Sequence, residues 1–185
     1  HHIDDSIETY FINMLRGTGA RGLTGIASRN GRIVRPLLFA TREDIETYAT
    51  QNEIPFRVDS SNMSMKHIRN RVRHEVVPML KEINPQFTSI MQRNMTHLGQ
   101  AQSFIDAAMA IIKRTILTES RGVYSLDIAA IDASLPRNFV IYEILSSEFG
   151  FRREVVSDIC TAIDNGATGR RFLASDMVAV VDRDV

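Results

Sequence analysis

The sequence predicts a mainly α-helical protein, with a short α/β segment before the helices and a small β-hairpin at the C-terminus. The helical part is predicted by apolar residues that recur at a helical period over some thirty residues, from Phe87 to Ile116. The α/β part is predicted by short apolar runs near the N-terminus and by a cluster of glycines, since five of the ten glycines fall within residues 17–31.

The first element is a helix that runs to about Leu15 and ends at Arg16-Gly17-Thr18-Gly19. We expect its buried stripe to consist of Ile7, Phe11, Ile12, Met14 and Leu15. The glycine-rich loop that follows, up to Gly25, carries interleaved arginines. Successive glycines can expose backbone amides to an anion, although a mobile surface loop has the same composition.

The α/β segment continues with a turn at Asn30-Gly31 and a short strand over residues 32–35 that ends at Pro36. Thr41 and Asp44 have the spacing of a capping box and predict a helix whose inward residues are Ile45, Tyr48 and Ala49. A second short strand is predicted from Ile54 to Val58.

A helix from Met65 to Ile83 opens the helical part, with Pro78 expected to kink or break it. Its apolar stripe consists of Ile68, Val72, Val76, Met79, Leu80 and Ile83. Asn84-Pro85 predicts the start of the long helix, and further helices are expected from Pro136 to Gly150 and from Arg153 to Asp164. Residues 172–174 and 177–181, separated by Ser175-Asp176, predict the hairpin.

Charge is segregated along the chain although the formal net charge is zero. Residues 9–42 contain six arginines and no acid, whereas residues 98–185 contain nine basic and twelve acidic residues. Arginine supplies 19 of the 22 basic residues, which suits phosphate recognition and is also the result that a compositional bias would produce. The single cysteine and the lack of a long apolar run exclude an internal disulfide and a membrane span, so a cytoplasmic location is expected.

Two groups of polar residues are candidates for a functional site. The first nine residues hold two histidines and three carboxylates, of which Asp5 and Glu8 are three apart and share a helix face. Acidic residues in a first helical turn are also explained by capping, and paired histidines by a purification tag. Lys66, Arg69, Asn70 and Arg73 form a basic face that is either solvated or directed at nucleic-acid phosphates.

The order and spacing of several motifs in residues 1–80 resemble the tRNA(Ile)-lysidine synthetase family of PP-loop ATP-pyrophosphatases. The motifs are His1-His2-x-Asp4-Asp5-x-x-Glu8-Thr9, Arg16-Gly17-Thr18-Gly19 with Gly22 and Gly25, Arg35-Pro36-Leu37-Leu38, Asp59-x-Ser61-Asn62, and Arg69-Asn70-Arg71-x-Arg73-His74 with Pro78-x-Leu80. The first and third motifs also resemble those of PP-loop tRNA thiolases, so the glycine loop and the block from Asn62 to His74 discriminate between the two families.

The resemblance implies a domain order and a reaction. Residues 1–62 would be the C-terminal part of a Rossmann-like PP-loop domain, and residues 63–185 a helical middle domain that begins with a basic connecting helix at 63–83. The family adenylates the wobble cytidine of an isoleucine tRNA with ATP, and free lysine then displaces AMP to form lysidine. ATP with Mg²⁺ would be the cofactors, and isoleucine tRNA and free lysine the partners, with no membrane. The oligomeric state, with a homodimer as one option, is left open by the sequence.

The resemblance also implies roles for particular residues. Asp4, Asp5 and Glu8 would be catalytic, with Asp5 and Glu8 holding the lysine amine and Asp4 or Asp5 near the metal. Substrate binding would involve His2, Arg35, Arg69, Asn70 and Arg73, and tRNA binding Arg16, Arg21, Lys66 and Arg71.

One departure from the family pattern is important. The nucleotide loop of the family, Ser-Gly-Gly-x-Asp-Ser, occurs nowhere in the 185 residues, so we expect a fragment that does not adenylate by itself. A non-catalytic RNA-binding helical module and a related tRNA thiolase remain alternatives. A metal-dependent phosphohydrolase that uses His1, His2, Asp4 and Asp5 is a further one.

Overall fold

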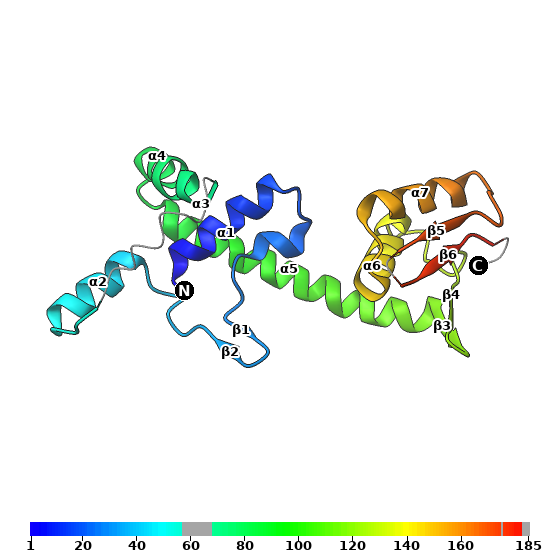
Figure 1. Cartoon of the computed structure of the whole chain (residues 1–185), viewed down its shortest axis with the longest axis horizontal. Coiled ribbons are helices and arrows are strands. Elements are labelled where there is room, and N and C mark those ends of the chain that lie inside the picture. Colours follow the sequence, from blue (N-terminus) through cyan, green and yellow to red (C-terminus); the bar gives the residue numbers. More distant parts are fainter. Residues whose placement is uncertain (57–67, 175, 183–185) are drawn as a thin grey trace. The chain divides into compact units, whose positions relative to one another are not determined.

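The computed structural model describes residues 1–56, 68–174 and 176–182, which form two compact units, residues 1–103 and 104–185 (Figure 1). Most of the described residues are helical, and the described strands pair into antiparallel two-stranded sheets. The predicted mainly α-helical class is therefore confirmed. Among the described helices, none is both long and apolar enough to cross a membrane. The predicted domain division at residue 62 stays a prediction.

The first unit is built around α1 (Ile3–Leu15), which lies beside α3 (Ile68–Arg71) and the π-helical segment Val72–Val76 (Figure 1). Between them the chain forms a 3₁₀ turn (Ala20–Thr24), strands β1 (Arg29–Asn30) and β2 (Ile33–Val34), and α2 (Arg42–Gln51). The π segment continues into α4 (Val77–Ile83). The core of this unit consists of Ile3, Ile7, Val72, Val77, Met91 and Met95.

Three details of the predicted first unit are wrong. Met14 and Leu15 are 46% and 68% exposed, because the buried partners of α1 contact its N-terminal half. Tyr48 of α2 is exposed, while Ile45 and Ala49 are half-buried. Residues 54–56 form no strand, and no described strand pairs with them, whereas a strand needs a neighbour to satisfy its backbone. Residues 57 and 58 lie outside the described residues.

The predicted helix at 65–83 is correct in extent over the described residues, but its apolar stripe is partly wrong. The Val77 N–H donates to the Val72 carbonyl, five residues back, which inserts one extra residue into the turn. Val72 and Val77 are consequently both buried, whereas Met79 and Ile83 are 52% and 74% exposed. Pro78 follows this π turn in the first turn of α4, and the helix is not broken there.

The long helix and the C-terminal elements agree with the prediction. Helix α5 (Phe87–Ile116) begins in the first unit and ends in the second, after Asn84 Oδ1 accepts the Gln86 N–H. The second unit adds α6 (Arg137–Phe149), ended by Gly150 at φ +70°, and α7 (Arg153–Asp164). Strands β5 (Arg171–Leu173) and β6 (Val178–Val180) form the predicted hairpin.

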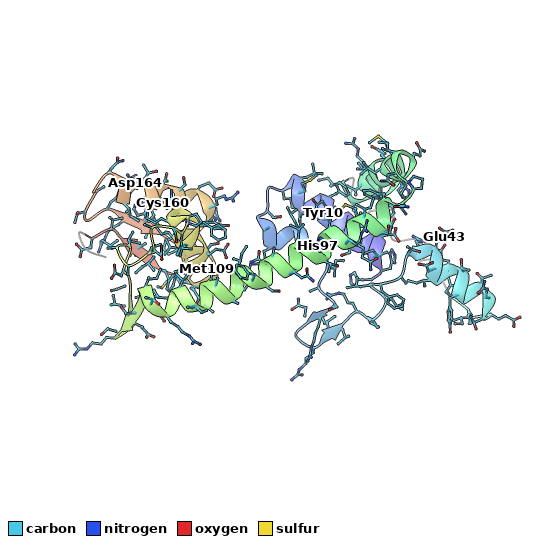
Figure 2. The ribbon with its side chains drawn as sticks, turned by 180° about the vertical axis from the view of Figure 1, so that it is seen from behind. Tyr10, Glu43, His97, Met109, Cys160 and Asp164 are labelled. Carbon is cyan, nitrogen blue, oxygen red and sulfur yellow. The ribbon has the colours of Figure 1, made fainter. Side chains whose placement is uncertain are left out.

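A second hairpin in this unit escaped the sequence analysis. It pairs β3 (Leu117–Ser120) with β4 (Val123–Leu126) and turns at Arg121 and Gly122, both with positive φ. The core of the unit lies under the two helices and includes Ile116, Val140, Ile141, Ile144, Val156 and Phe172. Cys160 is buried on α7, one turn before the labelled Asp164 (Figure 2).

Candidate active site

Three carboxylates, Asp4, Asp5 and Glu8, project from the N-terminal half of α1. The backbone N–H of His2, the N-cap residue, donates to Asp5 Oδ2 over 3.1 Å. Asp5 therefore caps the helix, which agrees with the capping explanation given above for acidic residues in a first helical turn. Its side chain is nevertheless 20% exposed, so part of it remains accessible to solvent.

Glu8 is the most buried of the three, at 2% exposure, and is neutralised by arginines from the neighbouring helix. Arg73 donates from Nε to Glu8 Oε1 over 2.6 Å and from Nη2 to Oε2 over 3.0 Å. Arg69 Nε lies 3.5 Å from Glu8 Oε2. A bidentate arginine–carboxylate pair fixes both the position and the plane of the guanidinium.

Asp5 lies at the edge of the same cluster, since its Oδ1 is 3.5 Å from Arg73 Nη2. The hydrogen bond to Glu8 raises the pKa of Arg73 above its usual value, with smaller contributions from the nearby carboxylates and with burial acting in the opposite direction. Arg73 therefore stays charged. The structure thus joins Asp5, Glu8, Arg69 and Arg73 in one group across α1 and the segment that begins at residue 68.

Asp4 makes contacts of a different kind. Its Oδ2 accepts the backbone N–H of Arg42, the first residue of α2, over 2.8 Å, and its Oδ1 lies 3.3 Å from Lys81 Nζ. Asp4 therefore ties α1 to α2 and α4. His2 lies between the two aspartates, with Nδ1 3.5 Å from Asp4 Oδ2 and Nε2 3.6 Å from Asp5 Oδ2.

The glycine-rich loop is fixed against α1 by two polar side chains that the sequence analysis did not single out. Ser6 Oγ accepts the Ile26 N–H over 2.8 Å, and Asn13 Nδ2 donates to the Gly22 carbonyl over 2.8 Å. Gly25 has φ +76°, and a Cβ there would come within 2.3 Å of Ser6 Oγ. The loop therefore approaches α1 at a distance that only glycine permits.

Two further residues of the site were also missed. The Thr9 hydroxyl donates to the Asp5 carbonyl and lies 3.5 Å from Arg69 Nη2, so it helps to orient Arg69. Lys81 was missed because it is eight residues after Arg73, a spacing that places it off the Arg73 face of an unbroken α-helix by about 80°. Thr9 is the last residue of the N-terminal motif from His1 to Thr9, which could have indicated it. No signal in the local sequence indicates Lys81.

The remaining predicted residues do not contact this group in the interactions described above. Arg35 donates from Nη1 to the Ala27 carbonyl, within its own hairpin region. Arg71 pairs with Glu75 on an exposed helix face, Asn70 is half-buried, and Arg16 and Arg21 are exposed. Lys66 lies outside the described residues.

A divalent metal does not fit the donor set found here. Within residues 1–56, 68–174 and 176–182, no three His, Cys, Asp or Glu side chains are placed to hold an ion together. Both oxygens of Asp4 and both of Glu8 already face nitrogen donors. We therefore derive no step through a metal at these residues.

Comparison with known proteins places the whole chain in one family. A family model described as a PP-loop domain matches residues 1–80, and one described as the TilS substrate binding domain matches residues 119–185. The chain is 38% identical over all 185 residues to the tRNA(Ile)-lysidine synthase of Parabacteroides distasonis, covering 41% of that protein. It is 36% identical to that of Porphyromonas gingivalis, covering 39%, and 44% identical over 105 residues to that of Thermosipho africanus, covering 25%.

The chain spans about two fifths of the length of the first two relatives and matches them from its first residue to its last. The chain, with its carboxylate–arginine group on α1 and the π-interrupted helix, therefore belongs to the tRNA(Ile)-lysidine synthase family.

Proposed function

We propose that this chain acts within a synthase that adenylates the wobble cytidine of isoleucine tRNA with ATP and then replaces AMP by free lysine, giving lysidine. The observation that supports it best is the identity of 38% over the entire chain to a protein of that name, combined with the Asp5, Glu8 and Arg73 group. Residues 1–62 belong to the PP-loop domain in this proposal, and residues 63–185 to the helical domain.

The charge arrangement suits the second half-reaction. A lysine ε-ammonium must be held by carboxylates and must lose a proton before its nitrogen can attack. Glu8 already accepts two hydrogen bonds from Arg73, so the partly exposed Asp5 makes the direct contact with the ammonium, and Glu8 supplies the second negative charge behind it. Arg73, held in plane by Glu8, faces the adenylate phosphate or the carboxylate of the amino acid.

The surrounding residues have supporting roles in the proposal. His2 and Asp4 fix the N-terminus of α1, Arg69 and Asn70 line the substrate side, and Arg35 holds the hairpin region. Arg16, Arg21, Lys66 and Arg71 contact the tRNA. ATP enters with its own Mg²⁺, which is not assigned to the residues described here, and the homodimer and the cytoplasmic location stay predictions.

The experiment is single-turnover kinetics on the complete synthase, with the tRNA adenylate and lysidine followed separately. Asp5→Asn and Glu8→Gln should each slow lysine transfer at least about tenfold, since neutralising one charge of a desolvated pair costs about 2–5 kcal/mol. Adenylation needs no amine, so the adenylate should accumulate in both variants.

A matched control is Glu46→Gln, which removes a carboxylate from the exposed Arg42–Glu46 pair of α2 and should leave both steps unchanged. Normal lysine transfer in both site variants would refute the proposed roles of Asp5 and Glu8. A complete protein that binds tRNA without forming adenylate or lysidine would instead support the non-catalytic RNA-binding module.

A further inference from the structure

In the helix of residues 68–83, the spacing of the apolar residues and the spacing of the basic residues favour different helical registers. Five of its apolar residues, Ile68, Val72, Val76, Leu80 and Ile83, have the spacing of one continuous α-helical stripe. Its basic residues Arg73 and Lys81 both contact carboxylates of α1, and their separation of eight residues does not match that stripe. The structure satisfies the basic contacts and leaves Ile83 74% exposed.

The π turn gives the register in which both basic residues contact carboxylates of α1. The Val77 N–H bonds to the Val72 carbonyl, so one residue is absorbed between Arg73 and Lys81. The eight residues from Arg73 to Lys81 therefore span the rotation of about seven α-helical residues. Lys81 lies within about 20° of the Arg73 face, whereas in an unbroken α-helix it would lie about 80° away. Arg73 then reaches Glu8 and Asp5, while Lys81 reaches Asp4 at 3.3 Å.

Pro78 is placed to hold this turn. A proline in an unbroken α-helix has no N–H for the carbonyl four residues back, and its ring collides with that carbonyl, here the one of His74. The wider π turn immediately before Pro78 removes the demand for that bond. Without the proline, the apolar spacing would favour the continuous α-helix, with Val76 and Leu80 in the places now taken by Val77 and Lys81.

We propose that Pro78 is a positioning residue of the lysine-transfer site: it fixes the π turn and thereby keeps Lys81 on Asp4 while Arg73 stays on Glu8. The inference rests on the proposed function for its catalytic meaning, because Asp4 adjoins Asp5 at the start of α1. The register itself is a property of the described residues and is tested separately.

The first measurement is zero-length carbodiimide cross-linking of the complete protein, which joins a carboxylate and an amine that are already in contact. The parent protein should yield an Asp4–Lys81 cross-link, identified by mass spectrometry. Pro78→Ala should lower its yield by about threefold or more, because relaxation to an α-helix moves Lys81 away from Asp4. Pro85→Ala, which removes a proline outside the helices, is the matched control and should leave the yield unchanged.

The second measurement is a rescue. Exchanging the two neighbours, Leu80→Lys with Lys81→Leu, should abolish the Asp4 cross-link in the protein that retains Pro78. Combined with Pro78→Ala, the same exchange should restore it at the lysine introduced at position 80, and should return single-turnover lysine transfer to within about twofold of the parent. A merely destabilising effect of Pro78→Ala would not be reversed by moving a lysine one position.

The inference is overturned if the Asp4–Lys81 cross-link persists in Pro78→Ala, or if the exchange is equally damaging with and without the proline. If the cross-link moves as expected but the rate of lysine transfer does not change with it, Pro78 sets the helical register, and the link between that register and the proposed function is refuted.

Discussion

At the scale of single residues, the site depends on a charged pair in which the Glu8 carboxylate is almost completely buried and the Arg73 side chain is 26% exposed. Glu8 is 2% exposed and accepts both of its short hydrogen bonds from Arg73. Removing one partner of such a pair leaves an uncompensated charge, so single substitutions should be more damaging than the loss of the pair as a whole. The Asp5 side chain is more accessible, at 20% exposure.

A residue-scale prediction concerns Gly25. Gly25→Ala should lower the free energy of unfolding by more than about 2 kcal/mol, because a Cβ meets both Ser6 Oγ and Met95 Sδ and the backbone has positive φ. Gly31→Ala is the matched control, since its φ is +58° but no atom lies within 4 Å. Urea unfolding checks both, and equal losses in the two variants would mean that the packing against Ser6 contributes nothing.

At the scale of elements, α2 is held by a capping box that the sequence predicted and the structure confirms. The Thr41 hydroxyl accepts the Asp44 N–H, and Asp44 Oδ2 accepts the Thr41 N–H over 2.8 Å. The hydrogen bonds from Thr41 lower the pKa of Asp44 below its usual value. The ionised carboxylate is therefore the form that stabilises the helix.

The lowered pKa of Asp44 determines the direction in which the folding stability changes with pH. A carboxylate whose pKa is lower in the folded state stabilises above its unfolded pKa, and this contribution is lost as the pH falls through the folded value. We expect the stability of the parent to fall more steeply between about pH 5 and pH 3 than that of Asp44→Asn. Thermal unfolding followed at several pH values measures the difference, and parallel curves for the two proteins would contradict it.

At the scale of the whole chain, the described arginines of the first unit differ in their surroundings. Arg69 and Arg73 face the buried Glu8, whereas Arg16 is exposed at the end of α1. Charges neutralised within the protein release few counterions when RNA binds, whereas exposed ones release more. We therefore expect Arg69 and Arg73, the described arginines of the predicted basic face, to contribute less to the salt dependence of RNA binding than Arg16.

This division predicts different salt dependences for tRNA binding. Arg16→Ala should lower the slope of log affinity against log salt by roughly 0.7 to 0.9. Arg73→Ala should leave the slope nearly unchanged and abolish lysine transfer, because its charge already faces Glu8. Filter binding of isoleucine tRNA across a salt series measures the slopes; a full unit lost in Arg73→Ala would place that side chain on a phosphate.

The sequence by itself determined most elements and named four of the residues that the structure brings together. The helix from Phe87 to Ile116, the ends at Gly150 and Asn165-Gly166, the capping box at Thr41 and the C-terminal hairpin all depend on local chemistry, so local patterns were sufficient. Motif spacing likewise named Asp5, Glu8, Arg69 and Arg73 as members of one site. Their roles in catalysis remain proposals.

Only the tertiary structure decided which of these residues meet and how. The π turn shifts the register by one residue, which buries Val77 in place of Val76 and brings Lys81 to Asp4. No pattern within the helix reveals this, because the apolar spacing by itself favours the continuous α-helix. The outcome depends on a proline and on carboxylates of α1 that lie 65 to 77 residues before the basic residues they contact. Long-range charge pairs thus overrode local periodicity at the candidate active site.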